Sequence, residues 1–391
     1  MVSVEEAIRL VKINLPNSTY ERIYLSTALN KVLSQDVISK INMPSFHQSS
    51  MDGYAVYFSD EIKSYKLVGE IAAGGSASEF DLKQGEAVRI FTGAKVPKGT
   101  NTVIQQEIVH RKEKTISFTE PVQVGKNIRL KGEQTTIGQI AMNKGDRITP
   151  AAIGFLAGLG ITEVDVFKKP TLSILVTGDE LVEPGDLLPE GKIYESNAIM
   201  LDAAIKQSGY ECVKSKTVED TYGATKSAIE NLLSSSDVIL ISGGISVGDY
   251  DFVGDALKEI GVKEIFYKVK QKPGKPLFFG SYNNKLVFAL PGNPAAALSC
   301  FYIYVLIALE IISRKSDGLE IAQLKLIEDY TKKGGRAQFL KAKIEGDKVR
   351  VLEGQSSSML HTFSGANGLV YVPENSTVLE ANNLVSVYKL P

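Results

Sequence analysis

The sequence predicts a multidomain α/β protein. We expect a central doubly wound α/β domain, an inserted small β domain, an elongated discontinuous α-rich domain and a C-terminal β barrel. The first observation is that buried apolar runs alternate with helical stretches between residues 170 and 313, which is typical of a doubly wound sheet. The second is that residues 44–134 are rich in glycine and β-branched residues. The third is a series of short strands with tight turns in residues 318–391.

Composition excludes several classes of function. The 391 residues suffice for about two to four domains, and Lys+Arg 44 against Asp+Glu 45 leaves a net charge of −1. No bulk attraction to nucleic acid or to an anionic membrane follows, so we expect neither as a partner. The two cysteines and three histidines are scattered along the chain. Zinc sites, disulfide frameworks and Ser-His or Cys-His catalysis are therefore disfavoured, and a cytoplasmic protein is expected.

The first 169 residues are expected to form two domains. Val4, Ala7, Ile8 and Val11 form a helical stripe, and the acidic residues beside them argue against a signal peptide. A second helix is expected over residues 148–161, whose small residues permit close packing. We group residues 1–43 with 135–169 as the elongated domain, and expect the first part to be helical. Residues 44–134 form the insert, with strands near residues 65–68 and 115–118.

The central domain is expected over residues 170–317. Its predicted strands and helices alternate, with strands at 172–177, 212–218, 238–242 and 264–269 and helices at 198–208, 224–234, 252–260 and after Pro294. The apolar stretch 295–309 is shorter than the roughly 20 residues that span a bilayer, so we expect a buried helix. The C-terminal domain, residues 318–391, has predicted strands at 337–344, 349–352, 369–372 and 384–390.

One polar site is expected where the central strands end. Backbone N–H groups of four residues in one turn can converge on an anion, namely Gly243, Gly244, Ser246 and Gly248. A helix opening near Phe252 adds its positive end. Lys272 and Lys275 bring two cations on a turn that Pro273 and Pro276 stiffen.

Carboxylates at the same edge indicate a divalent cation. Asp179, Glu180, Asp249 and Asp251 bring hard oxygens, which magnesium prefers together with substrate phosphate. A single glycine-rich turn is often only a turn, and the GGISVG run has neither the dinucleotide spacing nor a Walker lysine. The occurrence of four such turns in one α/β unit favours a phosphorylated substrate with a divalent ion.

Four motifs carry a family resemblance. TGDEL (177–181), GGISVGDYD (243–251), KPGKP (272–276) and LPGNP (290–294) resemble the molybdopterin-binding domain shared by molybdopterin adenylyltransferases and molybdopterin molybdenumtransferases. The flanking stretches resemble the second group, the MoeA and gephyrin E-domain family. These stretches are PSFHQSSMDGYAV (44–56), RIFTGAKVPKGTNTVIQQE (89–107) and GKNIRLKGE (125–133). The resemblance covers nearly the whole chain.

The resemblance implies a molybdenumtransferase of molybdenum cofactor biosynthesis. It would insert molybdate or tungstate into adenylylated molybdopterin with Mg²⁺-dependent release of AMP. The implied catalytic residues are Asp52, Thr92, Glu180, Asp220, Asp251, Lys272 and Lys275. The implied magnesium ligands are Asp251, Glu180 and Asp220. The implied cofactor-binding residues are Thr177, Gly178, Asp179, Gly243, Gly244, Ser246, Gly248, Pro291, Gly292, Asn293 and Arg129.

The resemblance also implies partners and leaves alternatives open. A homodimer with an active site shared between subunits is expected, with a molybdopterin adenylyltransferase acting upstream. The alternatives are a molybdopterin adenylyltransferase, which would resemble the central domain alone, and a non-catalytic scaffold, which could lose its carboxylates and lysines. Gln134 stands where the family often has an acidic residue, so no charge-dependent role is assigned to it. Arg336 and Ser364 are further candidates for substrate contact.

Overall fold

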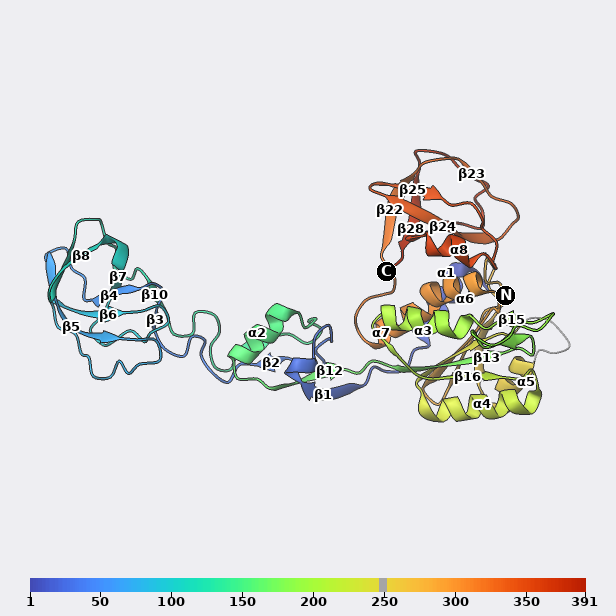
Figure 1. The fold of residues 1–391 in the computed structure, drawn as a ribbon, viewed down its shortest axis with the longest axis horizontal. Helices are drawn as coiled ribbons and strands as arrows, with labels where there is room; N and C mark the ends of the chain where they lie inside the picture. Colours follow the sequence, from blue (N-terminus) through green and yellow to red (C-terminus); the bar gives the residue numbers. More distant parts are fainter. Residues whose placement is uncertain (246–251) are drawn as a thin grey trace. The chain divides into compact units, whose positions relative to one another are not determined.

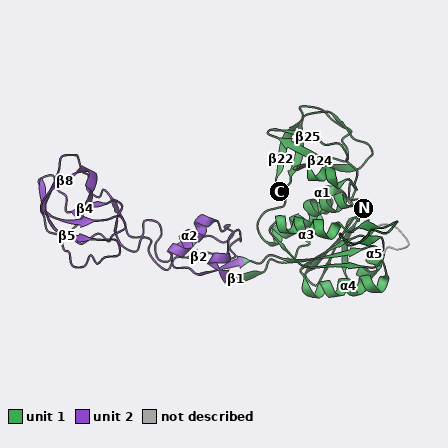
Figure 2. Cartoon of the chain, viewed as in Figure 1, with its two compact units in different colours: residues 1–21, 167–391 green, residues 22–166 purple. Residues whose placement is uncertain are grey.

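The computed structural model describes residues 1–245 and 252–391. The chain divides into two compact units (Figure 2). Unit 1 comprises residues 1–21 and 167–391, and unit 2 comprises residues 22–166. The ribbon in Figure 1 labels the helices and strands of both units.

A six-stranded mixed sheet lies at the centre of unit 1. Its order is β16 (Glu211–Val218), β13 (Thr171–Thr177), β17 (Val238–Ser242), β21 (Lys285–Leu290), β20 (Phe278–Tyr282) and β18 (Lys263–Tyr267). The first four strands are parallel, β20 pairs antiparallel with β21, and β18 pairs antiparallel with β20. The chain leaves β13 toward β16 and returns to β17 on the other side of β13. The switch point of this sheet therefore lies at the carboxyl ends of β13 and β17, where ligands bind in such folds.

Helices cover both faces of this sheet (Figure 1). α4 (Tyr222–Ser235) and α5 (Phe252–Ile260) share one apolar core with Leu175, Ile239 and Ile241. α3 (Asn197–Gln207), α6 (Pro294–Cys300) and α7 (Leu306–Ile312) share another core with Ile174 and Leu240. Successive strand residues enter opposite cores, as the alternation of side chains along a strand requires. The predicted doubly wound domain is confirmed.

The long apolar helix is a core element of unit 1. α6, a π-helical segment (Phe301–Val305) and α7 form one continuous helix over Pro294–Ile312. It is apolar and long enough to cross a membrane, but 89% of its most apolar window is buried inside the protein. The expected buried helix is confirmed.

The N-terminal helix buries its apolar face in the core of unit 1. α1 (Val4–Ile13) belongs to unit 1, where Val4, Ala7 and Val11 enter the same core as α7. The sequence grouped it with residues 135–169, because an amphipathic stripe reveals which face is buried but not which element covers it. The expectation that residues 1–43 are helical is wrong beyond α1, since β1 (Tyr20–Tyr24) and β2 (Val37–Ile38) follow it.

Unit 2 contains a second six-stranded sheet. Its order is β7 (Thr102–Gln105), β4 (Gly53–Val56), β6 (Glu86–Ile90), β5 (Ser64–Ile71), β9 (Thr115–Phe118) and β8 (Val109–Lys112). The rest of unit 2 carries α2 (Pro150–Gly158) and short two-stranded ribbons. These pair β1 with β12 (Glu163–Phe167), β2 with β11 (Ile140–Met142) and β3 (Gln48–Ser49) with β10 (Ile128–Arg129). The predicted inserted β sheet is present.

The C-terminal strands close into a barrel. β24 (Ala337–Glu345), β25 (Lys348–Val351), β22 (Ile321–Leu326), β28 (Leu384–Lys389) and β26 (Gly368–Val372) pair in that order, and β26 pairs back onto β24. β19 (Gln271–Lys272) adds to β24 in parallel, which joins the barrel to the central domain. Closure removes free sheet edges, and the predicted barrel is confirmed.

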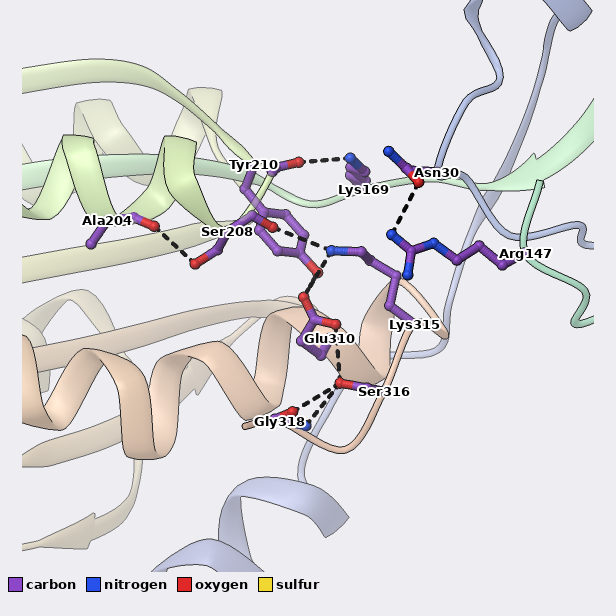
Figure 3. Close-up of polar contacts among 11 residues, drawn as sticks. Asn30, Arg147, Lys169, Ala204, Ser208, Tyr210, Glu310, Lys315, Ser316 and Gly318 are labelled. Atoms are coloured by element: carbon purple, nitrogen blue, oxygen red, sulfur yellow. Dashed lines mark hydrogen bonds and ion pairs between the residues drawn. The ribbon is translucent and has the colours of Figure 1, made fainter. Parts of the chain in front are cut away.

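A buried polar cluster joins the end of α7 to the turn that follows α3 (Figure 3). Glu310 Oε1 accepts hydrogen bonds from Lys315 Nζ at 2.9 Å and Tyr210 Oη at 3.1 Å, and Ser316 Oγ donates to Glu310 Oε2 at 3.1 Å. Lys315 Nζ also donates to Ser208 O at 3.2 Å. Burial and the nearby Glu310 charge raise the pKa of Tyr210. A buried carboxylate needs such partners, and these hydrogen bonds tie the end of α7 and the residues after it to the turn that follows α3.

Candidate functional site

Three turns meet at the carboxyl edge of the central sheet. A Cβ added at Gly243, whose φ is +96°, would lie 2.5 Å from Thr177 O. A Cβ at Gly244, with φ +58°, would lie 2.9 Å from Thr177 Oγ1, and one at Gly292 would contact Gly243 Cα at 3.8 Å. The turn after β17 therefore needs glycine both for its backbone conformation and for its close approach to β13. Residues from three of the four predicted motifs are adjacent.

Asn197 connects two of these turns. Its Nδ2 donates to Ser242 Oγ at 2.8 Å and to Gly292 O at 2.7 Å. Because a carbonyl oxygen only accepts, the bond to Gly292 fixes the orientation of the amide. The sequence patterns did not single out Asn197. The available signal was an asparagine at the first residue of the helix that follows the TGDEL turn.

A cavity of about 500 Å³ opens beside the three turns. Its lining includes Thr177, Glu180, Tyr194, Asn197, Ser242, Gly243, Pro276, Pro291, Gly292, Asn293 and Ser358. Asn197 Oδ1 is buried and has no hydrogen-bond partner among the described residues. Buried polar atoms are rarely left unpaired in a finished site, so the cavity has the character of a polar ligand site.

Carboxylates gather at the end of β13. Asp179 Oδ1 accepts a hydrogen bond from Asp220 N at 2.9 Å. Burial raises the pKa of Asp220, and the charges of Glu180 and Asp179 raise it further. A cation nearby would favour the ionised form of Asp220, which its surroundings disfavour.

The predicted metal ligands are only partly described. Glu180 and Asp220 interact electrostatically. Asp251, like the predicted anion-binding Ser246 and Gly248, lies outside the described residues. Within residues 1–245 and 252–391, no group of three or more His, Cys, Asp or Glu side chains is arranged to hold a metal ion. The two described carboxylates, Glu180 and Asp220, offer oxygen ligands of the kind that Mg²⁺ prefers.

The two lysines of the KPGKP motif flank a tight turn. Lys272 and Lys275 are exposed, and neither has an ion-pair partner in the part of the chain that the structure describes. Gly274 has φ +85°, and a Cβ there would lie 2.4 Å from Cys300 Sγ. Pro276 reaches the cavity lining. This turn therefore carries two exposed cations without an ion-pair partner among the described residues, and of its residues Pro276 lines the cavity.

Asp52 and Thr92 form a pair in unit 2. Asp52 Oδ1 accepts hydrogen bonds from Thr92 N and Thr92 Oγ1, each at 2.8 Å. These two bonds hold the pKa of Asp52 below its usual value, and the charge of Arg89 lowers it further. Two predicted catalytic residues, 40 positions apart, are thus in direct contact. Arg129 is exposed on β10 of the same unit.

The remaining candidates have local partners. Gln134 N donates to Met43 O at 2.9 Å. Arg336 Nη1 donates to Gln271 O at 3.3 Å, next to Lys272. Ser364 Oγ donates to His361 O at 2.7 Å, and it is Ser358 rather than Ser364 that lines the cavity. Asn293 Nδ2 donates to Ser357 Oγ at 3.1 Å, so the C-terminal barrel contributes a serine-rich loop to the site.

Comparison with known proteins accounts for the whole architecture. Residues 2–160 match the MoeA N-terminal region (domain I and II), residues 173–311 match a probable molybdopterin binding domain, and residues 323–390 match the MoeA C-terminal region (domain IV). A molybdopterin molybdenumtransferase of Staphylococcus aureus is 30% identical over 398 residues, which cover 99% of this chain and 95% of that protein. One from Staphylococcus epidermidis is 31% identical with the same coverage.

A solved structure agrees. A molybdopterin biosynthesis MoeA protein from Pyrococcus horikoshii superposes with a TM-score of 0.85 at 30% identity, covering 100% of this chain and 99% of that one. The resemblance seen in the motifs is confirmed. The chain belongs to the MoeA family of molybdopterin molybdenumtransferases, transferases of molybdenum cofactor biosynthesis.

Proposed function

We propose that this chain inserts molybdate, or tungstate, into adenylylated molybdopterin with release of AMP. The observation that carries the proposal is the cavity where the TGDEL turn, Gly243 and the LPGNP turn meet, with Glu180 in its lining. The raised pKa of Asp220, close to Glu180 and Asp179, agrees with it. A carboxylate that burial and like charges push toward its neutral form is suited to a site where a cation and a phosphorylated ligand arrive together. Family membership supports the same reaction.

Mg²⁺ would be held by Glu180 and Asp220, with Asp251 as the further ligand that the sequence indicates. Bound there, it would neutralise charge on the phosphoanhydride as the bond to AMP breaks. Gly243 and Gly244 would approach the phosphate with their backbone, because a side chain at either position has no room. Lys272 and Lys275 would attract the oxyanion of the metal substrate.

Asp52 and Thr92 would act on the same substrate from a second subunit. Thr92 keeps Asp52 ionised and oriented, which suits a group that accepts a proton or a cation rather than one that donates a proton. We therefore propose a homodimer with shared sites. We further propose a molybdopterin adenylyltransferase as the upstream enzyme and the cytoplasm as the location.

The flanking domains argue against the alternatives. An adenylyltransferase resembling the central domain alone would need neither the Asp52–Thr92 pair nor the C-terminal barrel. A non-catalytic scaffold would not need a carboxylate whose ionised form is disfavoured by its surroundings. A carboxylate with a perturbed pKa is more typical of a functional site, which favours catalysis.

The test is a reaction with purified components. The protein is incubated with adenylylated molybdopterin, molybdate and Mg²⁺, and AMP is measured by chromatography while cofactor is measured by activation of a cofactor-free molybdoenzyme. We expect AMP and active cofactor to appear together, and omission of Mg²⁺ to abolish both. Synthesis of the adenylylated pterin from ATP would instead indicate an adenylyltransferase, and binding of the pterin without turnover would indicate a scaffold.

A further inference from the structure

Lys341 is a buried lysine whose ammonium group has no carboxylate partner. It lies on β24 and is 4% exposed. Its Nζ donates to Gly354 O at 2.7 Å, Ser356 O at 3.2 Å and Met359 O at 2.9 Å. A lysine ammonium has three N–H donors, so every one is used. Among the described residues, no Asp or Glu oxygen forms an ion pair with it.

The three carbonyls belong to one segment, residues 353–359, which we call the serine loop. The backbone of Lys341 holds the same loop, because its N–H donates to Gln355 Oε1 at 2.9 Å and its carbonyl accepts from Gln355 Nε2 at 2.9 Å. Lys341 therefore forms hydrogen bonds with the serine loop through both its side chain and its main chain. Burial lowers the pKa of Lys341. A buried charge is costly, and its retention calls for a physical reason.

The opposite side of the serine loop reaches the cavity. Ser357 Oγ accepts a hydrogen bond from Asn293 Nδ2 at 3.1 Å, and Asn293 and Ser358 both line the cavity. In a trans peptide the N–H points away from the carbonyl. Since Ser356 O points toward Lys341 Nζ, the N–H of Ser357 points away from it. This N–H has no partner in the part of the chain that the structure describes.

We infer that Lys341 is a positioning residue that holds the serine loop against the cavity, so that the Ser357 N–H and the hydroxyls of Ser357 and Ser358 meet the substrate's anionic group. The inference rests on the proposed function, because it concerns the same cavity. Lys341 itself does not touch the substrate. It acts by orienting peptide dipoles, whose N–H ends favour negative charge.

Lys332 provides a matched control in the same barrel. It is 8% exposed, and its Nζ donates to Pro373 O at 2.8 Å and to Glu374 O. It is thus a second buried lysine held by backbone carbonyls. The segment that it holds does not contribute to the cavity lining. Loss of either lysine should disturb the barrel, but only loss of Lys341 should disturb the cavity.

The experiment compares Lys341→Met with Lys332→Met in the full-length protein. Thermal melting measures stability, and calorimetry measures the dissociation constant for adenylylated molybdopterin. We expect similar shifts in melting temperature. Only Lys341→Met should weaken ligand binding, by about tenfold, which is the scale of one lost hydrogen bond to a charged group. In turnover, its KM should rise more than its kcat falls.

A double-mutant cycle separates positioning from general destabilisation. Ser357→Ala combined with Lys341→Met should weaken binding by much less than the product of the two single effects, because both act through one loop. Ser357→Ala combined with Lys332→Met should give the product. Equal loss of affinity for the two lysine variants, or multiplicative behaviour in both cycles, would overturn the inference.

A second variant, Gln355→Ala, tests the inference if Lys341→Met does not fold. Gln355→Ala loosens the same loop without removing a buried charge, and it should weaken binding in the same direction. Unchanged binding in a folded Gln355→Ala protein would then count against the inference. Failure of the proposed function has a different signature, since the wild-type protein itself would not bind or convert the adenylylated pterin.

Discussion

Asp52 in unit 2 and Asp220 in unit 1 are both candidate catalytic carboxylates, yet their surroundings act on them in opposite directions. Thr92 donates two hydrogen bonds to Asp52 and lowers its pKa. Burial and the neighbouring Glu180 and Asp179 raise the pKa of Asp220. The ionised form of Asp52 is therefore stabilised by hydrogen bonds from Thr92. Among the described residues no cation offsets the charge of Asp220, and this difference is why we propose the metal site at the central sheet and not beside Asp52.

The largest expected effect is that of Asp220→Asn. We expect kcat to fall by about a hundredfold, the scale of losing one preorganised electrostatic contact. The variant should also melt at a higher temperature than the wild type in the absence of divalent cations. The reason is that the ionised form of Asp220 is disfavoured in the folded protein.

The sign of the stability effect depends on pH. Because folding raises the pKa of Asp220, the folded protein loses stability as the pH rises from the ordinary carboxyl pKa through the raised one. The advantage of the asparagine should therefore appear above that window and vanish below it. Melting curves at several pH values check this, with the neighbouring exposed Glu219→Gln as control. A lower melting temperature for Asp220→Asn at neutral pH would contradict the assignment.

A smaller effect is expected for Thr92→Val. Removing the hydroxyl leaves one of the two bonds that lower the pKa of Asp52, so protonation of Asp52 should occur at a higher pH. The acid limb of the pH–rate profile should then move toward neutral pH, with about tenfold lower activity on that limb and a smaller change near pH 8. Thr92→Ser keeps the hydroxyl and should retain the wild-type profile. Parallel losses at all pH values would show that Thr92 acts in another way.

The smallest effect is expected for Asn197→Ala, which tests how the turns of the central site are held together. It removes both donors that join Ser242 to Gly292 and should cost about 1–3 kcal/mol of stability. KM should rise by a few-fold while kcat changes little. Asn367→Ala, which removes a comparable amide from the barrel, is the control and should leave KM unchanged. Identical kinetics for the two variants would mean that Asn197 has no special place in the site.

The sequence was informative where structure is local. β-branched runs such as 172–177 and 238–242 predicted strands to within about a residue, because short continuous apolar runs of this kind are typical of strands buried on both faces. The glycines after β17 were recognised as a turn, since they directly follow such a run. The apolar stripe of α1 predicted a helix with one buried face but did not identify the core of unit 1 as the surface that buries it.

Residues that act through tertiary contacts could not be predicted. Asn197, Ser357 and Lys341 are polar residues without any local motif. Asn197 donates to a carbonyl group that is distant in sequence, that of Gly292. Lys341 donates to carbonyl groups of the serine loop, which come within reach only when that loop is folded. The contact between Asp52 and Thr92 depends on the pairing of β4 with β6, which the sequence pattern alone does not reveal. Only the family resemblance indicated that both residues belong to one site.

In the shared-site model, the Asp52–Thr92 pair and the Asp220 group serve one reaction centre, contributed by two subunits. The most direct test is subunit exchange between Asp52→Asn and Asp220→Asn, each of which we expect to keep little activity alone, with exchange verified by native mass spectrometry. Random mixing makes half of the dimers mixed, and each mixed dimer holds one intact site. Activity should therefore recover to about a quarter of the wild-type value. No recovery despite exchange would contradict the model, because sites built within single chains would each keep one lesion.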